Sequence, residues 1–231
     1  MSRNDEDDGF EPTILALLPY AHMDYEDGCL FYQTMNALLT YANRTLGVTD
    51  EREVVIDGGQ RERQNVGARV GEMLWRNREV VNDFVDTNPC GLSREHVDTA
   101  RHWYYAVRDL FTCIYADEDG LLLMNSEAIF AVGAMEQEAD ALIHSVPCLM
   151  IVTLLPFKGG IVTDGKVIHV SDKPKPEAAQ CISRQISELI GLGVISTSQE
   201  LIDYSKGITD EEWLPPDILR QLDEALGITH A

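Results

Sequence analysis

The chain has 231 residues, of which 45% are hydrophobic and 25% charged, and 39 acidic against 18 basic side chains give a formal net charge of −21. This composition is that of a globular protein long enough to bury a core, and it excludes disordered and fibrous classes. Nucleic acids and anionic lipid surfaces are bound mainly through clustered Lys and Arg, so the charge disfavours both as direct partners.

The N-terminal segment is acidic and almost free of apolar side chains. Residues 1–10 therefore bury too little surface to offset their ordering entropy, and we predict that they are disordered. The N-terminus lacks the basic and then apolar pattern of a signal peptide, and no apolar run approaches the roughly 20 residues that span a bilayer. We expect a cytoplasmic protein without membrane association.

Helical spacing dominates the first half of the chain. Apolar residues recur every three or four positions over 30–46, which predicts a core-facing helix ended by Gly47. The same spacing over 66–85 predicts a second helical stretch, in one or two pieces. Residues between these stretches are predicted to form an exposed connection with a short strand at 54–56.

A third helix is predicted after Ser93, which is placed to cap it. Its buried face is expected to include Trp103, Tyr104 and Val107. Consecutive helical positions point in different directions, so Trp103, Tyr104 and Tyr105 span more than one face. At least one ring should lie at the edge of the core or in a pocket. Two interpretations are open, ordinary packing and an aromatic groove for a peptide or small ligand.

Beyond residue 108 the pattern changes to short apolar runs, several of them β-branched or aromatic. Turn signals separate these runs at Asp119-Gly120, Gly159-Gly160 and Asp164-Gly165. The pattern predicts antiparallel hairpins. One interruption, over 135–147, has helical spacing and ends at a proline.

Two more helices are predicted near the C-terminus, one over 178–190 and one over about 215–226. The fold class expected from all these elements is α+β. An N-terminal helical half packs on a mainly antiparallel sheet or small barrel, followed by a helical C-terminal tail. The predicted organisation is a disordered acidic N-terminus over 1–10, a single α+β domain over 11–195 and a helical tail over 196–231.

The sequence LLPFKGGIVTDG occupies residues 154–165. It resembles a strand-hairpin motif of a family of microbial proteins that have no assigned activity. The resemblance implies a shared strand arrangement and no catalytic residue, and Thr163 stands where it implies a tyrosine. From the residues alone, the hairpin is either structural or a site at which Lys158 and the backbone amides of Gly159 and Gly160 hold an anion.

Residues suited to metal binding occur only in pairs, and those suited to nucleophilic chemistry occur singly. A zinc site needs three or four ligands, and no third ligand can be named for any histidine–carboxylate pair. The pairs are His22 with Asp24, Asp98 with His102, and Asp140 with His144. The candidate nucleophiles Cys90, Ser126 and Ser145 stand in no recognised motif. We expect neither a metal nor a cofactor.

The five cysteines form no close pair, and we predict that all are free thiols. They are Cys29, Cys90, Cys113, Cys148 and Cys181.

The lack of catalytic motifs favours a non-catalytic cytoplasmic interaction or regulatory module that binds a protein partner. One alternative is an acidic mimic of nucleic acid that occupies a basic partner. Another is an enzyme with a small-molecule pocket near the 156–165 hairpin. The ligand-binding residues expected for such a pocket are Lys158, Gly159, Gly160, Trp103 and Tyr104. The sequence decides neither between enzyme and binding module nor the oligomeric state.

Overall fold

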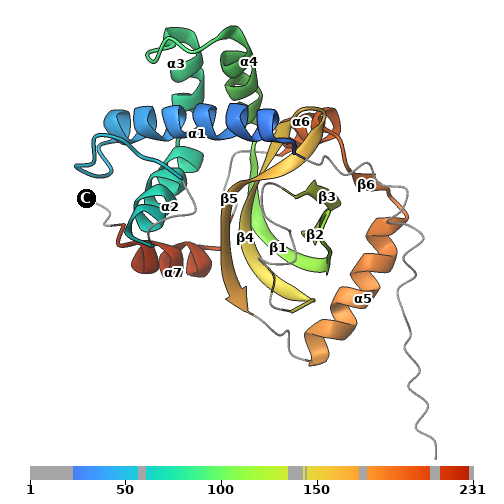
Figure 1. Cartoon of the computed structure of the whole chain (residues 1–231). Coiled ribbons are helices and arrows are strands. Elements are labelled where there is room, and N and C mark those ends of the chain that lie inside the picture. Colours follow the sequence, from blue (N-terminus) through green and yellow to red (C-terminus); the bar gives the residue numbers. More distant parts are fainter. Residues whose placement is uncertain are drawn as a thin grey trace, which may run out of the picture.

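The structure is a computed structural model that describes residues 23–56, 61–134, 143, 145–171, 176–208 and 214–228. For residues 61–64 and 176–180 it describes the backbone alone. Helices from the first half of the chain gather at one end of a curled sheet, and the C-terminal helices pack around that sheet (Figure 1). Several sequence-based predictions lie outside the described residues. These are the disorder of 1–10, most of the helix over 135–147, and the candidates His22, Asp140 and His144.

The N-terminal layer contains four helices in the described part of the chain. They are α1 (Tyr25–Leu46), α2 (Arg61–Arg76), α3 (Glu79–Thr87) and α4 (Arg94–His102). The side chain of Asp24 caps α1 by accepting a hydrogen bond from the Asp27 amide, and Gly47 ends it in the left-handed conformation. The predicted helices over 30–46 and 66–85 are confirmed, the latter in two pieces.

Two local predictions in this half are wrong. Residues 54–56 form no strand, because Thr40 and Asn36 side chains of α1 bind the backbone of Val54 and Ile56. The third helix ends at His102 and passes through a 3₁₀ turn, η2 (Trp103–Tyr105), into a strand. Val107 is buried as expected, but it is buried by the sheet.

The sheet has six strands in the order β5-β4-β1-β2-β3-β6. All neighbouring pairs are antiparallel except β3 with β6. β3 contacts β5 across the concave face, but the two strands are not paired and the sheet stays open. The predicted hairpins are confirmed and the closed barrel is not formed. The strands are β1 (Val107–Ala116), β2 (Gly120–Met124), β3 (Ile129–Gly133), β4 (Cys148–Phe157), β5 (Gly160–Ser171) and β6 (Val194–Ile195).

Asp164-Gly165 is not the tight turn that the dipeptide predicts, because β5 runs through it. The pairing of β4 with β5 shifts here and leaves Thr153 opposite the three residues 164–166. Gly165 has a φ of 80°, a conformation that allows β5 to accommodate the two extra residues as a β-bulge. Asp164 and Lys166 are two positions apart along the strand, so both lie on the convex face of the sheet.

Three C-terminal helices pack on the sheet. They are α5 (Pro176–Ile190), α6 (Ser198–Gly207) and α7 (Pro216–Leu226), and α5 and α7 match their predicted spans. α6 inserts Leu201 into the apolar cluster of the concave face. On the convex face, α5 packs Leu189 against β2 and β3, and α7 packs Leu222 against Ile151 of β4. Within the segment predicted as a tail, α6 and α7 therefore pack on the sheet.

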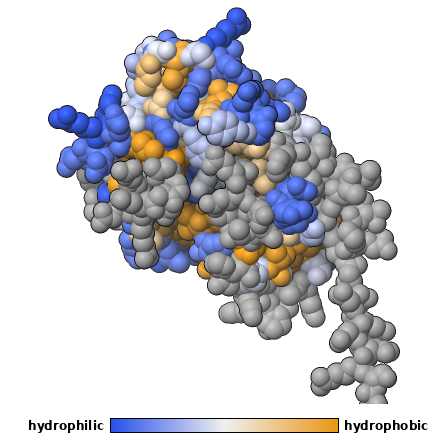
Figure 2. All heavy atoms as spheres, viewed as in Figure 1, coloured by the Kyte–Doolittle hydropathy of each residue, from blue (hydrophilic) through white to orange (hydrophobic). Residues whose placement is uncertain are grey.

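The face seen in Figure 2 carries both polar and apolar residues. Apolar residues appear in Figure 2 as separate patches among hydrophilic ones. The large apolar side chains that are well exposed in the described ranges are Tyr25, Val146, Val170 and Leu192. None of the described helices has both the length and the apolar character needed to cross a bilayer.

Candidate functional site

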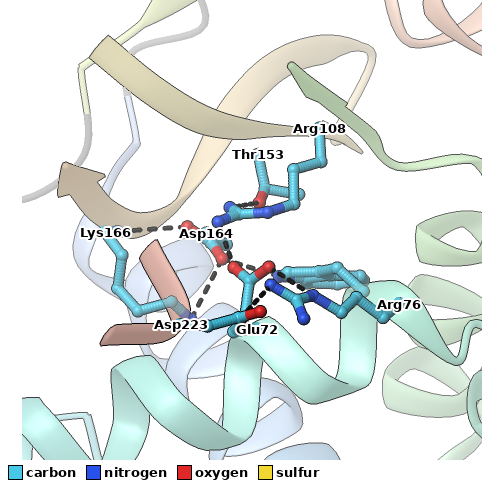
Figure 3. A network of polar contacts seen from close by, with 8 residues as sticks. Glu72, Arg76, Arg108, Thr153, Asp164, Lys166 and Asp223 are labelled. Atoms are coloured by element: carbon cyan, nitrogen blue, oxygen red, sulfur yellow. Dashed lines mark hydrogen bonds and ion pairs between the residues drawn. The ribbon is translucent and has the colours of Figure 1, made fainter. Parts of the chain in front are cut away.

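Six ionisable side chains meet where α2, the convex face of the sheet and α7 come together (Figure 3). We call this cluster the charged junction. It contains three acids and three bases, so its formal charge is balanced. Because four separate elements contribute, no sequence window contains it. Its members are Glu72 and Arg76 from α2, Arg108 from β1, Asp164 and Lys166 from β5, and Asp223 from α7.

Glu72 is the shared acceptor of the charged junction, and its side chain is only 1% exposed. It accepts a hydrogen bond from Nε of Arg76 at 2.8 Å and another from Nη2 of Arg108. Arg76 also donates Nη2 to Asp223 at 2.6 Å, which links α2 to α7. Burial by itself lowers the pKa of Arg76, but the bonds to Asp223 and Glu72 outweigh it and leave that pKa raised.

Asp164 is the second buried acceptor of the junction, with no exposed surface. Trp75 donates its indole Nε1 to Oδ2 at 2.7 Å, and the Lys166 ammonium lies 3.0 Å from the same oxygen. The ammonium rests on α2 at Gly71, where an added Cβ would stand 2.3 Å from Nζ. Gly71 therefore provides the space in which Lys166 pairs with Asp164.

A cavity of about 600 Å³ opens beside the charged junction, and we call it the junction cavity. One part of its wall is apolar, and the rest carries three arginines with acidic side chains between them. Its lining residues are Leu46, Glu72, Trp75, Arg76, Asn77, Arg78, Glu79, Val80, Asp83, Tyr104, Arg108, Leu214 and Leu219.

Arg108 is the most buried arginine at this wall, with its side chain 9% exposed. Its Nη1 donates to Thr153 at 3.0 Å and its Nη2 to Glu72, while its Nε is buried and has no hydrogen-bond partner among the described atoms. Buried polar groups in folded proteins are nearly always hydrogen-bonded. Because this Nε has essentially no accessible surface, it is a buried group without a partner and offers no donor to the cavity.

The hairpin residues that the sequence singled out lie at a different cavity, of about 750 Å³, between α4, α6 and the β4–β5 turn. Lys158 Nζ is 2.9 Å from Glu95 and 3.1 Å from Asp27, and the bonds to these carboxylates raise its pKa. Gly159 and Gly160 use their carbonyls to accept hydrogen bonds from Ser198. The Lys158 ammonium is thus paired with two carboxylates already.

The predicted aromatic pair is divided between core and cavity. Trp103 has no exposed surface and packs edge-on against Phe31, with ring centroids 5.3 Å apart. Tyr104 lines the junction cavity and donates its hydroxyl to Glu79 at 2.9 Å. The five ligand-binding residues expected from the sequence therefore do not converge on one site.

A second polar cluster lies on the concave face of the sheet. Asp109 of β1 accepts a hydrogen bond from Asn125 at 2.9 Å, and Asn125 also binds the hydroxyl of Tyr204 at 3.0 Å. Burial raises the pKa of Asp109, with the charge of Glu127 as a further cause, and burial raises the pKa of Tyr204 to about 12. No Lys or Arg pairs with Asp109 among the described residues.

Sequence reasoning missed both clusters, although two signals were present. Glu72 and Arg76 have the four-residue spacing of a helical ion pair. Asp109 falls two residues after Val107 and two before Phe111, so it shares their inward direction along β1. A carboxylate at an inward strand position indicates a buried polar group that needs partners.

The remaining chemical candidates stay apart. All five cysteines are free, as predicted, and Cys90 is exposed. Asp98 pairs with Arg94, and His102 lies at the cavity next to Lys158. No three His, Cys, Asp or Glu side chains in the described part of the chain gather as metal ligands.

These features define a mixed helix and sheet protein with a curled, mostly antiparallel sheet and a buried charged junction beside a cavity. Comparison with models of protein families, with curated proteins and with solved structures gave no match. The family resemblance of residues 154–165 stays a prediction, and the function has to be argued from the cavity itself.

Proposed function

We propose that the chain is a non-catalytic module that binds a small molecule in the junction cavity. The observation that carries this proposal is the wall of a single cavity of about 600 Å³, which combines apolar side chains with the guanidinium groups of Arg76, Arg78 and Arg108 and with carboxylates between them. Ligand sites of about 300 to 1,000 Å³ are typically apolar with a few fixed polar groups. The junction cavity matches that description in size, and its wall carries more charged groups than such sites usually have.

Binding without catalysis is favoured by the chemistry of the wall. Among the described lining residues there is no Ser, Cys, His or Lys, and the groups capable of acid–base chemistry are carboxylates and Tyr104. The charged groups are arginines and carboxylates, which position a ligand by hydrogen bonds and charge.

A regulatory role is supported by the contribution of α7. Leu214, which precedes α7, and Leu219 within it line the junction cavity, and Asp223 of the same helix bonds to Arg76. A ligand that contacts this wall binds only when α7 is docked, so it stabilises the docked state. We propose that ligand occupancy thereby controls the surface that α7 presents to a protein partner.

The indole of Trp75 makes the first proposal testable, because it lines the cavity and its Nε1 proton has a fixed partner in Asp164. We expect some members of a mixed fragment library to shift the Trp75 indole resonance in ¹H–¹⁵N NMR spectra. Leu219→Trp should abolish these shifts by filling the cavity. The matched control Leu192→Trp, at a site 81% exposed that does not line the cavity, should preserve them.

A library without any member that moves this resonance in the folded protein would refute the proposed function. Shifts that survive Leu219→Trp would place the binding site elsewhere and would also refute it.

A further inference from the structure

We infer that Cys113 and Cys148 are a redox pair, which a small disulfide oxidant joins into one bond across β1 and β4 when the chain folds or its concave face opens. The concave face then has two covalent states, with the two strands linked or unlinked. This inference is independent of the ligand proposed for the junction cavity.

The register of the sheet brings together two cysteines that are far apart in the sequence. In the pairing of β1 with β4, Cys113 and Cys148 are direct Cα partners. Directly opposite residues of antiparallel strands have Cα atoms about 4.5 or 5.5 Å apart, and disulfides form where this distance is about 4.4 to 6.8 Å. The backbone therefore already meets the main geometric condition for a disulfide.

The two side chains also lie on the same face of the sheet. Both belong to the apolar cluster of the concave face, and both are almost completely buried. Burial is the main cause of the raised pKa of Cys113, and Cys148 adds to it through its charge and a side-chain hydrogen bond, which requires the two thiols to be close. The pair is thus aligned in its side chains as well as in its backbone.

The surrounding ladder leaves room for a small adjustment. Cys148 is the first residue of β4, and the pairing of β1 with β2 shifts directly after Cys113. A ladder is locally interrupted at such a shift, so the strand is less constrained there by its own hydrogen bonds. The two sulfur atoms can approach to the bond length of about 2.0 Å without a change at the centre of either strand.

The oxidant that we propose is a low-molecular-weight disulfide such as glutathione disulfide. One cysteine thiolate attacks a sulfur of the oxidant, forms a mixed disulfide and releases one glutathione thiolate. The second cysteine thiolate then attacks the protein sulfur of the mixed disulfide and displaces the other glutathione thiolate. Two protein thiols lose two electrons in total, and one glutathione disulfide becomes two glutathione molecules that carry the two thiol protons.

Burial determines when this exchange takes place. The thiolate is the reacting form, and the pKa of Cys113 is raised to about 12, so the pair exchanges poorly in the closed fold. In the unfolded chain both thiols are accessible and have their ordinary pKa. The bond is therefore made while the chain folds or while the concave face is open, and the closed sheet then shields it from reductants.

The bond would change how readily the concave face opens. It encloses residues 114–147, which include β2 and β3, in a covalent loop. A cross-link of this kind lowers the conformational entropy of the unfolded chain and so stabilises the folded one. The oxidation state at the time of folding thereby sets how easily this face opens afterwards.

The test uses a variant in which only the candidate pair is left, Cys29→Ser with Cys90→Ser and Cys181→Ser. The reduced protein is unfolded in urea and refolded with reduced glutathione alone or with a mixture of glutathione and its disulfide. Free thiols are then alkylated, and linkages are identified by mass spectrometry. We expect most molecules from the mixture to be linked between Cys113 and Cys148 and to melt about 5 to 10 °C above the reduced form.

The matched control adds Cys148→Ala to the same variant. With a single thiol left, it should form no internal linkage, and its melting temperature should be the same in both buffers. Glutathione disulfide added to the already folded pair should form the bond at least about tenfold more slowly than during refolding, because both thiols are buried.

Three results would overturn the inference. One is free thiols at Cys113 and Cys148 in protein that has refolded, by circular dichroism, in the presence of glutathione disulfide. Another is a linked protein that melts below the reduced form, because the bond would then oppose the native register. The third is equally fast formation in folded and refolding protein, which would show that burial does not control the bond. If the triple serine variant does not fold, the unmodified chain is digested after the same treatment and gives the same linkage map.

Discussion

Each face of the sheet holds an aspartate, which is fully buried on the convex face and half-buried on the concave face. Asp164, on the convex face, has no exposed surface and is paired with Lys166 and with the indole of Trp75. Asp109, on the concave face, is bonded to Asn125 and to the Leu110 amide but to no described basic side chain. Burial raises the pKa of Asp109 above its ordinary value.

This difference shows that partners, rather than depth, determine what a buried carboxylate does to stability. A charge in a low-dielectric environment is tolerated when hydrogen bonds and an opposite charge replace its water. The charged junction supplies an opposite charge to each of its three carboxylates. The concave cluster does not, so its carboxylate opposes folding when it is ionised.

Removing the shared acceptor of the charged junction should have the largest effect. Glu72→Ala leaves the guanidinium groups of Arg76 and Arg108 without their common partner in a buried position. We expect the free energy of unfolding, measured with urea, to fall by about 3 to 5 kcal/mol, as for other broken buried ion pairs. Glu188→Ala, at a carboxylate 69% exposed, is the control and should change little. A loss for Glu72→Ala within the range of surface substitutions would contradict the role given to the junction.

Two glycines of α2 allow a paired test of Lys166. Gly67→Ala adds a methyl group at an ordinary 3.6 Å from Ile56, whereas Gly71→Ala places one 2.3 Å from the Lys166 ammonium. Both gain about 1 kcal/mol of helix propensity. Gly71→Ala also displaces Lys166 from buried Asp164, so it should be less stable than Gly67→Ala by about 1 to 3 kcal/mol, the range for an unsatisfied buried group.

The same two alanine substitutions, made in a protein that also carries Lys166→Met, test the cause of that difference. Without the ammonium there is no ion pair to lose, so the gap between the two alanine variants should narrow in urea unfolding. A gap of unchanged size would show that Gly71 acts through another contact.

Asp109→Asn should stabilise the protein slightly at neutral pH, by less than the difference between the glycine variants. The folded pKa of Asp109 lies above its unfolded value. The native state therefore binds more protons between the two values, and stability falls as the pH rises through this window. Unfolding free energies measured from acid to neutral pH should show this fall in the parent protein and a weaker one in the variant. An Asp109→Asn variant that is less stable than the parent at neutral pH would contradict this prediction.

Thiol labelling should report whether the same concave face opens, and this experiment is expected to leave the stability of the protein unchanged. Cys90 and Cys181 are exposed and should react quickly with a disulfide reagent. Cys113 and Cys148 are buried in the concave core, and burial raises the pKa of Cys113 to about 12, so both should react only on unfolding. Fast labelling of either in the native protein would show that this face opens.

Local patterns were enough to predict most elements of the fold. The three- and four-residue spacing over 30–46, together with Gly47, identified α1 because a helix buries one face and ends where a left-handed residue is tolerated. Asp164-Gly165 was misread because a glycine with positive φ suits a hairpin turn and a β-bulge equally. Only the pairing of β5 with β4 distinguishes them.

The candidate site could not be predicted in the same way. Glu72, Arg108 and Asp223 meet only after the sheet has curled and α7 has docked. In the sequence each is an ordinary charged residue of an acidic chain. The hairpin residues attracted attention instead, since glycines and a lysine form a recognisable local pattern, and Lys158 proved to be paired with Asp27 and Glu95.

The bond between Arg76 and Asp223 joins residues 147 positions apart, and all six strands lie between them. During synthesis α2 leaves the ribosome long before α7 exists, so the wall of the junction cavity is assembled in two stages separated by the synthesis of all six strands. The cavity is completed only when its last helix arrives. A molecule that binds there distinguishes the finished fold from every nascent form of the chain.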